Sequence, residues 1–132
     1  MSGEPVSDDE VLMCRIPPGT PWFEPPDRLT SANFKLNKRQ NEQGLSVYRR
    51  SILDEQVVLQ KPEAIPGSFV VTATAGEIRN LTNAAGEHLR LDVVPADDED
   101  NPGHAEIRGP KPGKLALSAS KALRDLFARS PT

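Results

Sequence analysis

Short apolar runs separated by turns rich in proline and glycine dominate the hydrophobic pattern of this chain. Apolar and β-branched runs that stop at such turns are typical of strands. The pattern predicts strands at residues 11–16, 29–36, 45–52, 68–73, 89–94 and 104–108. The run Ser68-Phe-Val-Val-Thr-Ala73 is the strongest of these, because it is both β-branched and bounded by turn residues.

Helical periodicity is clearest at residues 114–129, where apolar side chains recur every three or four positions. A second helix is predicted from Thr74-Ala-Gly-Glu77, which matches a capping box, and is expected to run through Leu81. Residues 53–59 fit either a short helix or an extended run. The predicted fold is therefore α+β: a curved, mostly antiparallel sheet with one short internal helix and a C-terminal amphipathic helix.

The domain organisation follows from the polar and proline-rich segments. Residues 1–10 are acidic and polar and are predicted to be a disordered N-terminal lead. Residues 11–129 are predicted to form a single α+β domain. Within it, residues 17–27 hold five prolines around Trp22 and Phe23 and are expected to be a loop, since proline cannot donate to a sheet ladder.

Composition indicates a reducing compartment and no membrane segment. Cys14 is the single cysteine, so no intrachain disulfide can form. The first ten residues lack the features of a signal peptide, and no apolar run reaches the roughly 20 residues that span a bilayer. We therefore expect a cytoplasmic protein. No cofactor is expected, and no metal, because His88 and His104 lack metal-ligand spacing.

Charge is distributed unevenly along the chain, although the net charge is only −3. Residues 28–50 carry six basic side chains and one acid, Glu42. Residues 108–129 carry another six against Asp125. Such segregation is typical of a basic face for an acidic partner, but it also fits solvated surface with compensating charges nearby. Both interpretations stay open.

One set of residues suggests catalysis. His104 and Glu106 are two positions apart on a predicted strand and so share a face, while Arg15 and Ser46 lie on other strands. A cation for pyrophosphate, a hydroxyl for ribose and a carboxylate for developing positive charge would suit an NAD- or nucleotide-handling enzyme with a distant ADP-ribosyltransferase-like site. Small β-proteins also offer such combinations by chance.

Basic and aromatic residues alternate in a second candidate region. Five cations flank Phe34 and Tyr48, an arrangement that favours weak nucleic-acid binding: Lys35, Lys38, Arg39, Arg49 and Arg50. The opposing interpretation places Phe34 in the core and the cations on a sheet edge, where they discourage unwanted pairing. No established nucleic-acid-binding motif accompanies them.

Short motifs occur in a fixed order along the chain: Arg15-Ile-Pro17, Ser31-Ala-Asn-Phe34, Leu45-Ser-Val47 and Asn101-Pro-Gly-His104-Ala. This set resembles a family of uncharacterised bacterial proteins with R-I-x-P, S-x-x-F, L-S-V and N-P-x-H-A motifs. The resemblance implies an accessory protein encoded beside larger effectors in conflict or defence gene clusters. It also draws attention to Arg15, Ser31, Phe34, Ser46, His104 and Glu106.

The leading hypothesis is a small accessory domain that binds a larger protein partner from the same operon. Its binding surface would be an exposed sheet edge, the proline-rich loop or the basic helix. The residues predicted to bind are Trp22, Phe23, Ser31, Phe34, Lys35, Arg49 and Arg50. Enzymatic handling of NAD or a nucleotide and weak nucleic-acid binding are the two alternatives.

Overall fold

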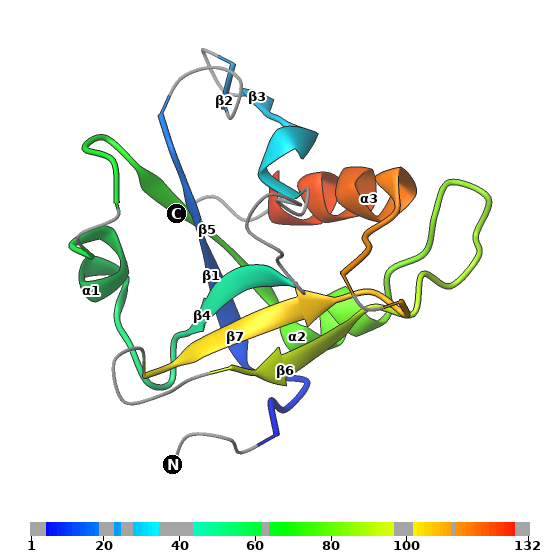
Figure 1. Cartoon of the computed structure of the whole chain (residues 1–132), viewed down its shortest axis with the longest axis horizontal. Coiled ribbons are helices and arrows are strands. Elements are labelled where there is room, and N and C mark those ends of the chain that lie inside the picture. The colour runs from blue at the N-terminus through cyan, green and yellow to red at the C-terminus, as the bar shows by residue number, and fades with distance from the viewer. Residues whose placement is uncertain are drawn as a thin grey trace.

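The structure is a computed structural model that describes residues 5–18, 23–24, 28–34, 44–61, 64–96, 102–111 and 113–128 (Figure 1). Its centre is an open five-stranded sheet in the order β5-β1-β4-β7-β6, in which every neighbouring pair is antiparallel. The strands are β1 (Val11–Ile16), β4 (Leu45–Arg49), β5 (Phe69–Thr74), β6 (Asp92–Pro95) and β7 (His104–Arg108). Together with the helices below, this sheet confirms the predicted α+β class.

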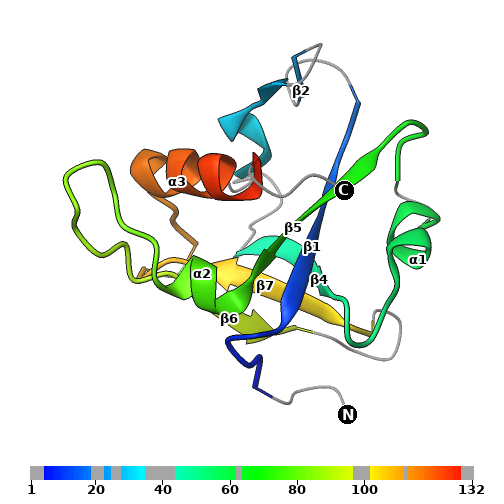
Figure 2. The same ribbon diagram turned by 180° about the vertical axis from the view of Figure 1, so that it is seen from behind.

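Strand alternation divides the side chains of the sheet between two apolar clusters. Leu12, Cys14 and Ile16 of β1 point into the larger cluster, which also contains Ile78 of α2 (Ala75–Arg79) and Phe127 of α3 (Leu117–Ala128). Val58 of α1 (Glu55–Leu59) belongs to the smaller cluster, with Met13, Tyr48 and Val70. Helices α1 and α3 accordingly lie on opposite sides of the β1–β5 pair (Figure 1 and Figure 2).

The C-terminal helix confirms the predicted amphipathic stripe, although it begins at Leu117 and not at residue 114. Its buried side chains pack against a 3-10 helix, η1 (Ser31–Phe34). The rings of Phe34 and Phe127 stack with centroids 5.4 Å apart. Ser120 Oγ donates a 2.6 Å hydrogen bond to the Phe34 carbonyl, so this polar side chain is satisfied inside the core.

The strand predicted at residues 29–36 is wrong over the positions that the structure describes. Arg28–Leu29 form a short strand, β3, paired with β2 (Phe23–Glu24) inside the predicted loop. The chain then turns into η1, where Asn33 Nδ2 donates to the Thr30 carbonyl at 3.0 Å. This local hydrogen bond, together with burial of Phe34, competes successfully with strand pairing. Residues 35–36 lie outside the described part of the chain.

Side-chain caps define where the two short helices begin. The predicted capping box is present: Thr74 Oγ1 accepts from the Glu77 amide at 3.2 Å, and Glu77 Oε1 accepts from the Thr74 amide at 3.0 Å. Helix α1 resolves the ambiguity at residues 53–59, because Asp54 Oδ1 accepts from the Val57 amide as an N-cap. Strand β6 begins later than residue 89, since Arg90 adopts a left-handed φ of 57°.

Residues 5–10, which belong to the predicted disordered lead, contact the rest of the domain. Val6 is 3% exposed and belongs to the larger apolar cluster. Glu10 is also buried, and Arg79 Nη1 donates to Asp8 Oδ1 at 2.8 Å. These contacts come from residues that are distant in sequence, which a local reading of an acidic segment does not capture. Residues 1–4 lie outside the described part.

In the described part of the chain, no helix has both the length and the apolar character required to cross a bilayer.

Candidate functional site

The four residues predicted to act in catalysis project from one face of the sheet. Ser46 pairs with Glu106 across β4 and β7, and Tyr48 pairs with His104. Val47 and Ala105, which alternate with them, point into the larger apolar cluster. Ser46, His104 and Glu106 therefore occupy the opposite face, as does Arg15 on β1. We call this side of the sheet the polar face.

Ser46 and His104 make direct contact on the polar face. Ser46 Oγ lies 3.0 Å from His104 Nε2, and His104 Nδ1 lies 3.2 Å from the Ala96 carbonyl oxygen. A carbonyl oxygen can only accept, so Nδ1 carries the proton and donates it. In the neutral ring Nε2 is then the acceptor, and the Ser46 hydroxyl donates to it. The pair has the polarity of a nucleophile facing its base.

Arg15 and Glu106 have other partners on this face. Arg15 Nη1 donates to the Val58 carbonyl in α1 at 3.1 Å. Glu106 Oε1 accepts from Arg108 Nε at 2.9 Å and from Arg108 Nη2 at 2.7 Å. The structure therefore brings Ser46 and His104 together, directs Arg15 toward α1, and pairs the Glu106 carboxylate with a cation.

The Tyr48 ring packs against the His104 ring. Tyr48 is 5% exposed, and its ring centroid lies 5.7 Å from that of His104. Lys61 Nζ sits 5.2 Å from the centroid of the same tyrosine ring, a cation–π contact. The imidazole is therefore packed against a buried aromatic as well as hydrogen-bonded at both nitrogens. The sequence did not indicate the contact between Tyr48 and His104, because these residues are far apart along the chain.

Two of the residues predicted to bind a partner are structural. Phe34 is 1% exposed and stacks on Phe127, so it is not available at the surface. Arg49 is 7% exposed and donates from Nε to Glu10 Oε1 at 3.0 Å. Burial of these side chains, and of Tyr48, removes most of the alternating basic and aromatic surface expected near residues 34–50.

The other predicted binding residues have different placements. Arg50 is exposed at the turn that follows β4. Phe23 lies in β2 and Ser31 lies in η1. Trp22 and Lys35 fall outside the described residues.

Cysteine chemistry and metal binding find little support in the described part of the chain. Burial raises the pKa of the Cys14 thiol to about 12, and the neighbouring Arg15 charge offsets this only partly. A thiol with such a pKa is inert near neutral pH. The described residues contain no group of three His, Cys, Asp or Glu side chains that could hold a metal ion.

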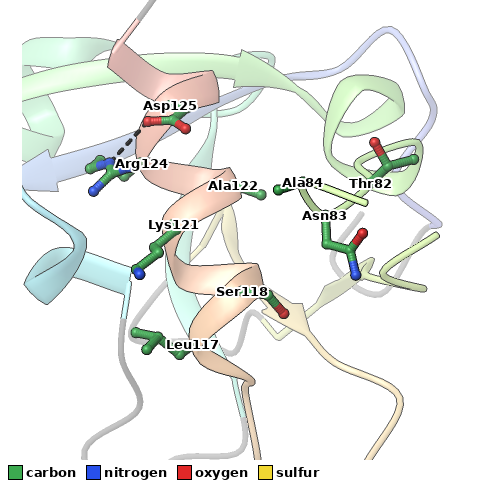
Figure 3. A pocket seen from close by; sticks show the side chains of 9 residues that line it. All are labelled: Thr82, Asn83, Ala84, Leu117, Ser118, Lys121, Ala122, Arg124 and Asp125. Atoms are coloured by element: carbon green, nitrogen blue, oxygen red, sulfur yellow. Dashed lines mark hydrogen bonds and ion pairs between the residues drawn. The ribbon is translucent and has the colours of Figure 1, made fainter. Parts of the chain in front are cut away.

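A groove of about 610 Å³ lies elsewhere, along α3 (Figure 3). Ala122 of α3 and Ala84 of the segment after α2 face each other across it, and Asn83 shares the Ala84 side. Asn83 Oδ1 accepts from the amides of Ala85 and Glu87 at 2.9 Å each, so this side chain shapes the turn. Helix α3 packs on the larger apolar cluster, so the groove and the polar face lie on different sides of the sheet.

The two edges of the sheet differ in how their backbone groups are satisfied. On β6, the Val93 amide donates to Asp92 Oδ1 at 2.7 Å, and Arg79 Nη2 donates to the Val93 carbonyl at 3.0 Å. Pro95 has no N–H to offer. These features block β6 against a further strand. On β5, the backbone groups of Val70, Thr72 and Thr74 point away from β1, and no strand of the described chain lies beyond them. Val70 is buried and Glu77 accepts from the Thr74 amide, so Thr72 is the half-buried position of this edge without such protection.

Comparisons with protein-family models, with curated proteins and with solved structures find no match to this chain. The family resemblance drawn from the ordered motifs therefore stays a prediction.

Proposed function

We propose that the chain is a protein-binding accessory domain that accepts an extended segment of a larger partner along β5. The observation that carries this proposal is the contrast between the two edges. Side chains and a proline block β6, whereas on β5 no described strand lies beyond the outward-pointing backbone groups of the half-buried Thr72. Natural sheets commonly protect their edges, so backbone groups without such protection favour pairing.

The chemistry of β5 suits strand addition. Its sequence, Phe-Val-Val-Thr-Ala-Thr, is rich in β-branched residues, and its register with β1 is continuous from Val11↔Thr74 to Ile16↔Phe69. An added strand would gain main-chain hydrogen bonds from the outward-pointing groups, and its side chains would supply specificity. The extended conformation of β5 is thus fixed by β1 before a partner binds.

Exposed apolar side chains lie close to this edge in the chain. Ile65 is 51% exposed in the segment that leads into β5, and Val57 is 43% exposed on α1. The Ile65 segment is held in place because Ser68 Oγ donates to the Ile65 carbonyl at 2.6 Å. Such side chains offer contacts for apolar residues of a partner strand.

The partner class follows from the family resemblance, which implies a larger protein encoded in the same gene cluster. Co-expression with each neighbouring gene product, followed by affinity purification, identifies the partner. A domain that remains alone with every neighbour contradicts the proposal.

Hydrogen exchange tests where the partner binds, because bound amides exchange more slowly. We expect the Thr72 amide, which points away from β1, to exchange rapidly in the free protein and slowly in the complex. The β6 amides should show no such change, because that edge is already blocked. Protection confined to any other surface contradicts strand addition at β5.

A matched pair of substitutions tests the edge by affinity. Thr72 and Val94 are both half-buried, and they lie on the open and blocked edges respectively. We expect Thr72→Lys to weaken partner binding about tenfold or more, because an edge lysine opposes pairing. Val94→Lys should leave affinity unchanged. Thermal unfolding of both variants confirms that each remains folded, and equal affinities of the two contradict the assignment.

A further inference from the structure

We infer that Ser46 is the nucleophile of an ester-cleaving or acyl-transfer site, with His104 as its general base and the Ala96 carbonyl as the group that orients the base. This inference is independent of partner binding at β5. It uses the polar face of β4 and β7 and not the edge at β5, and a chain that binds no partner could still carry it.

The three groups stand in the order that such chemistry requires. Ser46 Oγ is 3.0 Å from His104 Nε2, and His104 Nδ1 is 3.2 Å from the Ala96 oxygen. Because the carbonyl fixes the proton on Nδ1, the lone pair of Nε2 faces the serine hydroxyl. Nucleophile, base and orienting acceptor within hydrogen-bond reach are the diagnostic arrangement for an activated serine.

Rigidity and access both favour this role. Ser46 and His104 lie on β4 and β7, which are interior strands of the sheet, and the His104 ring packs against buried Tyr48. The Ser46 side chain is nevertheless exposed, so a substrate can reach it. A buried structural hydroxyl would not combine these properties.

The reaction balances with the groups present and the substrate. Ser46 Oγ attacks the carbonyl carbon of an ester while its proton passes to His104 Nε2. The C–O bond to the leaving alcohol then breaks, and the alcohol takes that proton. Water repeats the sequence on the acyl-serine and releases a carboxylic acid.

The same face carries a cation that is ion-paired with a carboxylate. Arg108 is 47% exposed at its side chain, and it lies against Glu106, the cross-strand partner of Ser46. Positive charge near a tetrahedral intermediate stabilises it.

A fluorophosphonate probe tests the nucleophile directly, because displacement of fluoride leaves a stable phosphonyl-serine that intact-mass spectrometry detects. We expect one adduct per chain, its loss in Ser46→Ala, and a rate at least 100-fold lower in His104→Gln. The matched controls are Ser68→Ala and His88→Gln. Ser68 donates only to a local carbonyl and His88 accepts only a local amide in the described contacts, so both should label like the unmodified chain. Absence of labelling, or labelling that survives Ser46→Ala, overturns the inference.

A second measurement separates activation from folding defects. In Ser46→Cys the introduced thiol faces Nε2, and Cys14 gives little background because it is buried. We expect iodoacetamide alkylation at pH 6.5 to be at least tenfold faster than for Ser68→Cys, since a nearby imidazole favours the thiolate. Adding His104→Gln should remove this advantage. Equal rates for the two thiols overturn the assignment of His104 as base, because a folded chain with an unactivated thiol gives that result.

Discussion

Arg49 donates from Nε to Glu10 Oε1 at 3.0 Å, across 39 residues of sequence. Both side chains are less than a tenth exposed. Ser51 completes the arrangement, donating to the same carboxylate from Oγ at 2.6 Å and from its amide at 3.2 Å. This ion pair ties the segment before β1 to the end of β4.

Loss of the Glu10 charge should destabilise the fold, because it removes the carboxylate that is ion-paired with the buried Arg49 guanidinium. For Glu10→Gln we expect the free energy of unfolding to fall by about 3 kcal/mol, as measured by urea titration. The exposed neighbour provides the control: Asp9→Asn should change stability by no more than about 0.5 kcal/mol. Equal effects of the two substitutions contradict the structural role of Glu10.

The same carboxyl predicts an acid-sensitive contribution to stability. Burial by itself would raise the pKa of Glu10, but hydrogen bonds from Ser51 and Arg49 outweigh it and lower the pKa below the ordinary 4.5. A depressed pKa means that this stabilisation is fully present above the unfolded value and is lost as pH falls through the folded value. The stability difference between the unmodified chain and Glu10→Gln should therefore be constant near neutral pH and shrink below about pH 4.5. A difference that stays constant down to the acid transition contradicts this linkage.

The reactivity of the buried Cys14 thiol should measure unfolding of the domain. Its thiol is 8% exposed, and burial raises its pKa to about 12. We expect no reaction with an aromatic disulfide reagent at pH 8 in the native protein, and one equivalent of reaction in denaturant. The reaction rate at low denaturant should track the opening of the core. Rapid modification of the native chain contradicts the burial of β1.

The stacked pair Phe34 and Phe127 should contribute strongly to stability. Phe34→Ala is expected to cost about 3–5 kcal/mol, since it removes a fully buried ring from beneath α3. Phe34→Leu should cost less, because it refills part of the volume. A double-mutant cycle with Phe127→Leu should give a coupling of about 1 kcal/mol. Strict additivity in chemical denaturation contradicts direct ring packing.

Local patterns were sufficient to predict the elements whose structure depends on neighbouring residues. The run at β1, the β-branched run at β5 and the capping box at Thr74 all specify their conformation within a few positions. The apolar stripe of α3 does the same over a longer window. In contrast, residues 31–34 carry a strand-like alternation, but they form a 3-10 helix because α3 covers Phe34.

Prediction of the candidate site was limited by contacts between distant residues. Alternation placed His104 and Glu106 on one face of a strand, and this is the face they occupy. The sequence grouped Ser46 with His104 in one candidate set, but it did not predict their direct contact, since they lie 58 residues apart and are brought close by the pairing of β4 with β7. Arg49 shows the same limit. Its sequence context suggests a surface cation, but the turn before β1 supplies Glu10 and buries it.

The position of β1 in the sheet has a consequence for the folding rate. This strand is flanked by β4 and β5, so its partners, such as Arg49 for Leu12 and Thr74 for Val11, are synthesised long after it. Loops must close before these pairs form, and topologies of this kind reach the native state in milliseconds to seconds, more slowly than helical bundles. During that interval β1 exposes an apolar segment that can associate with other unfolded chains. Refolding yield should consequently fall as protein concentration rises.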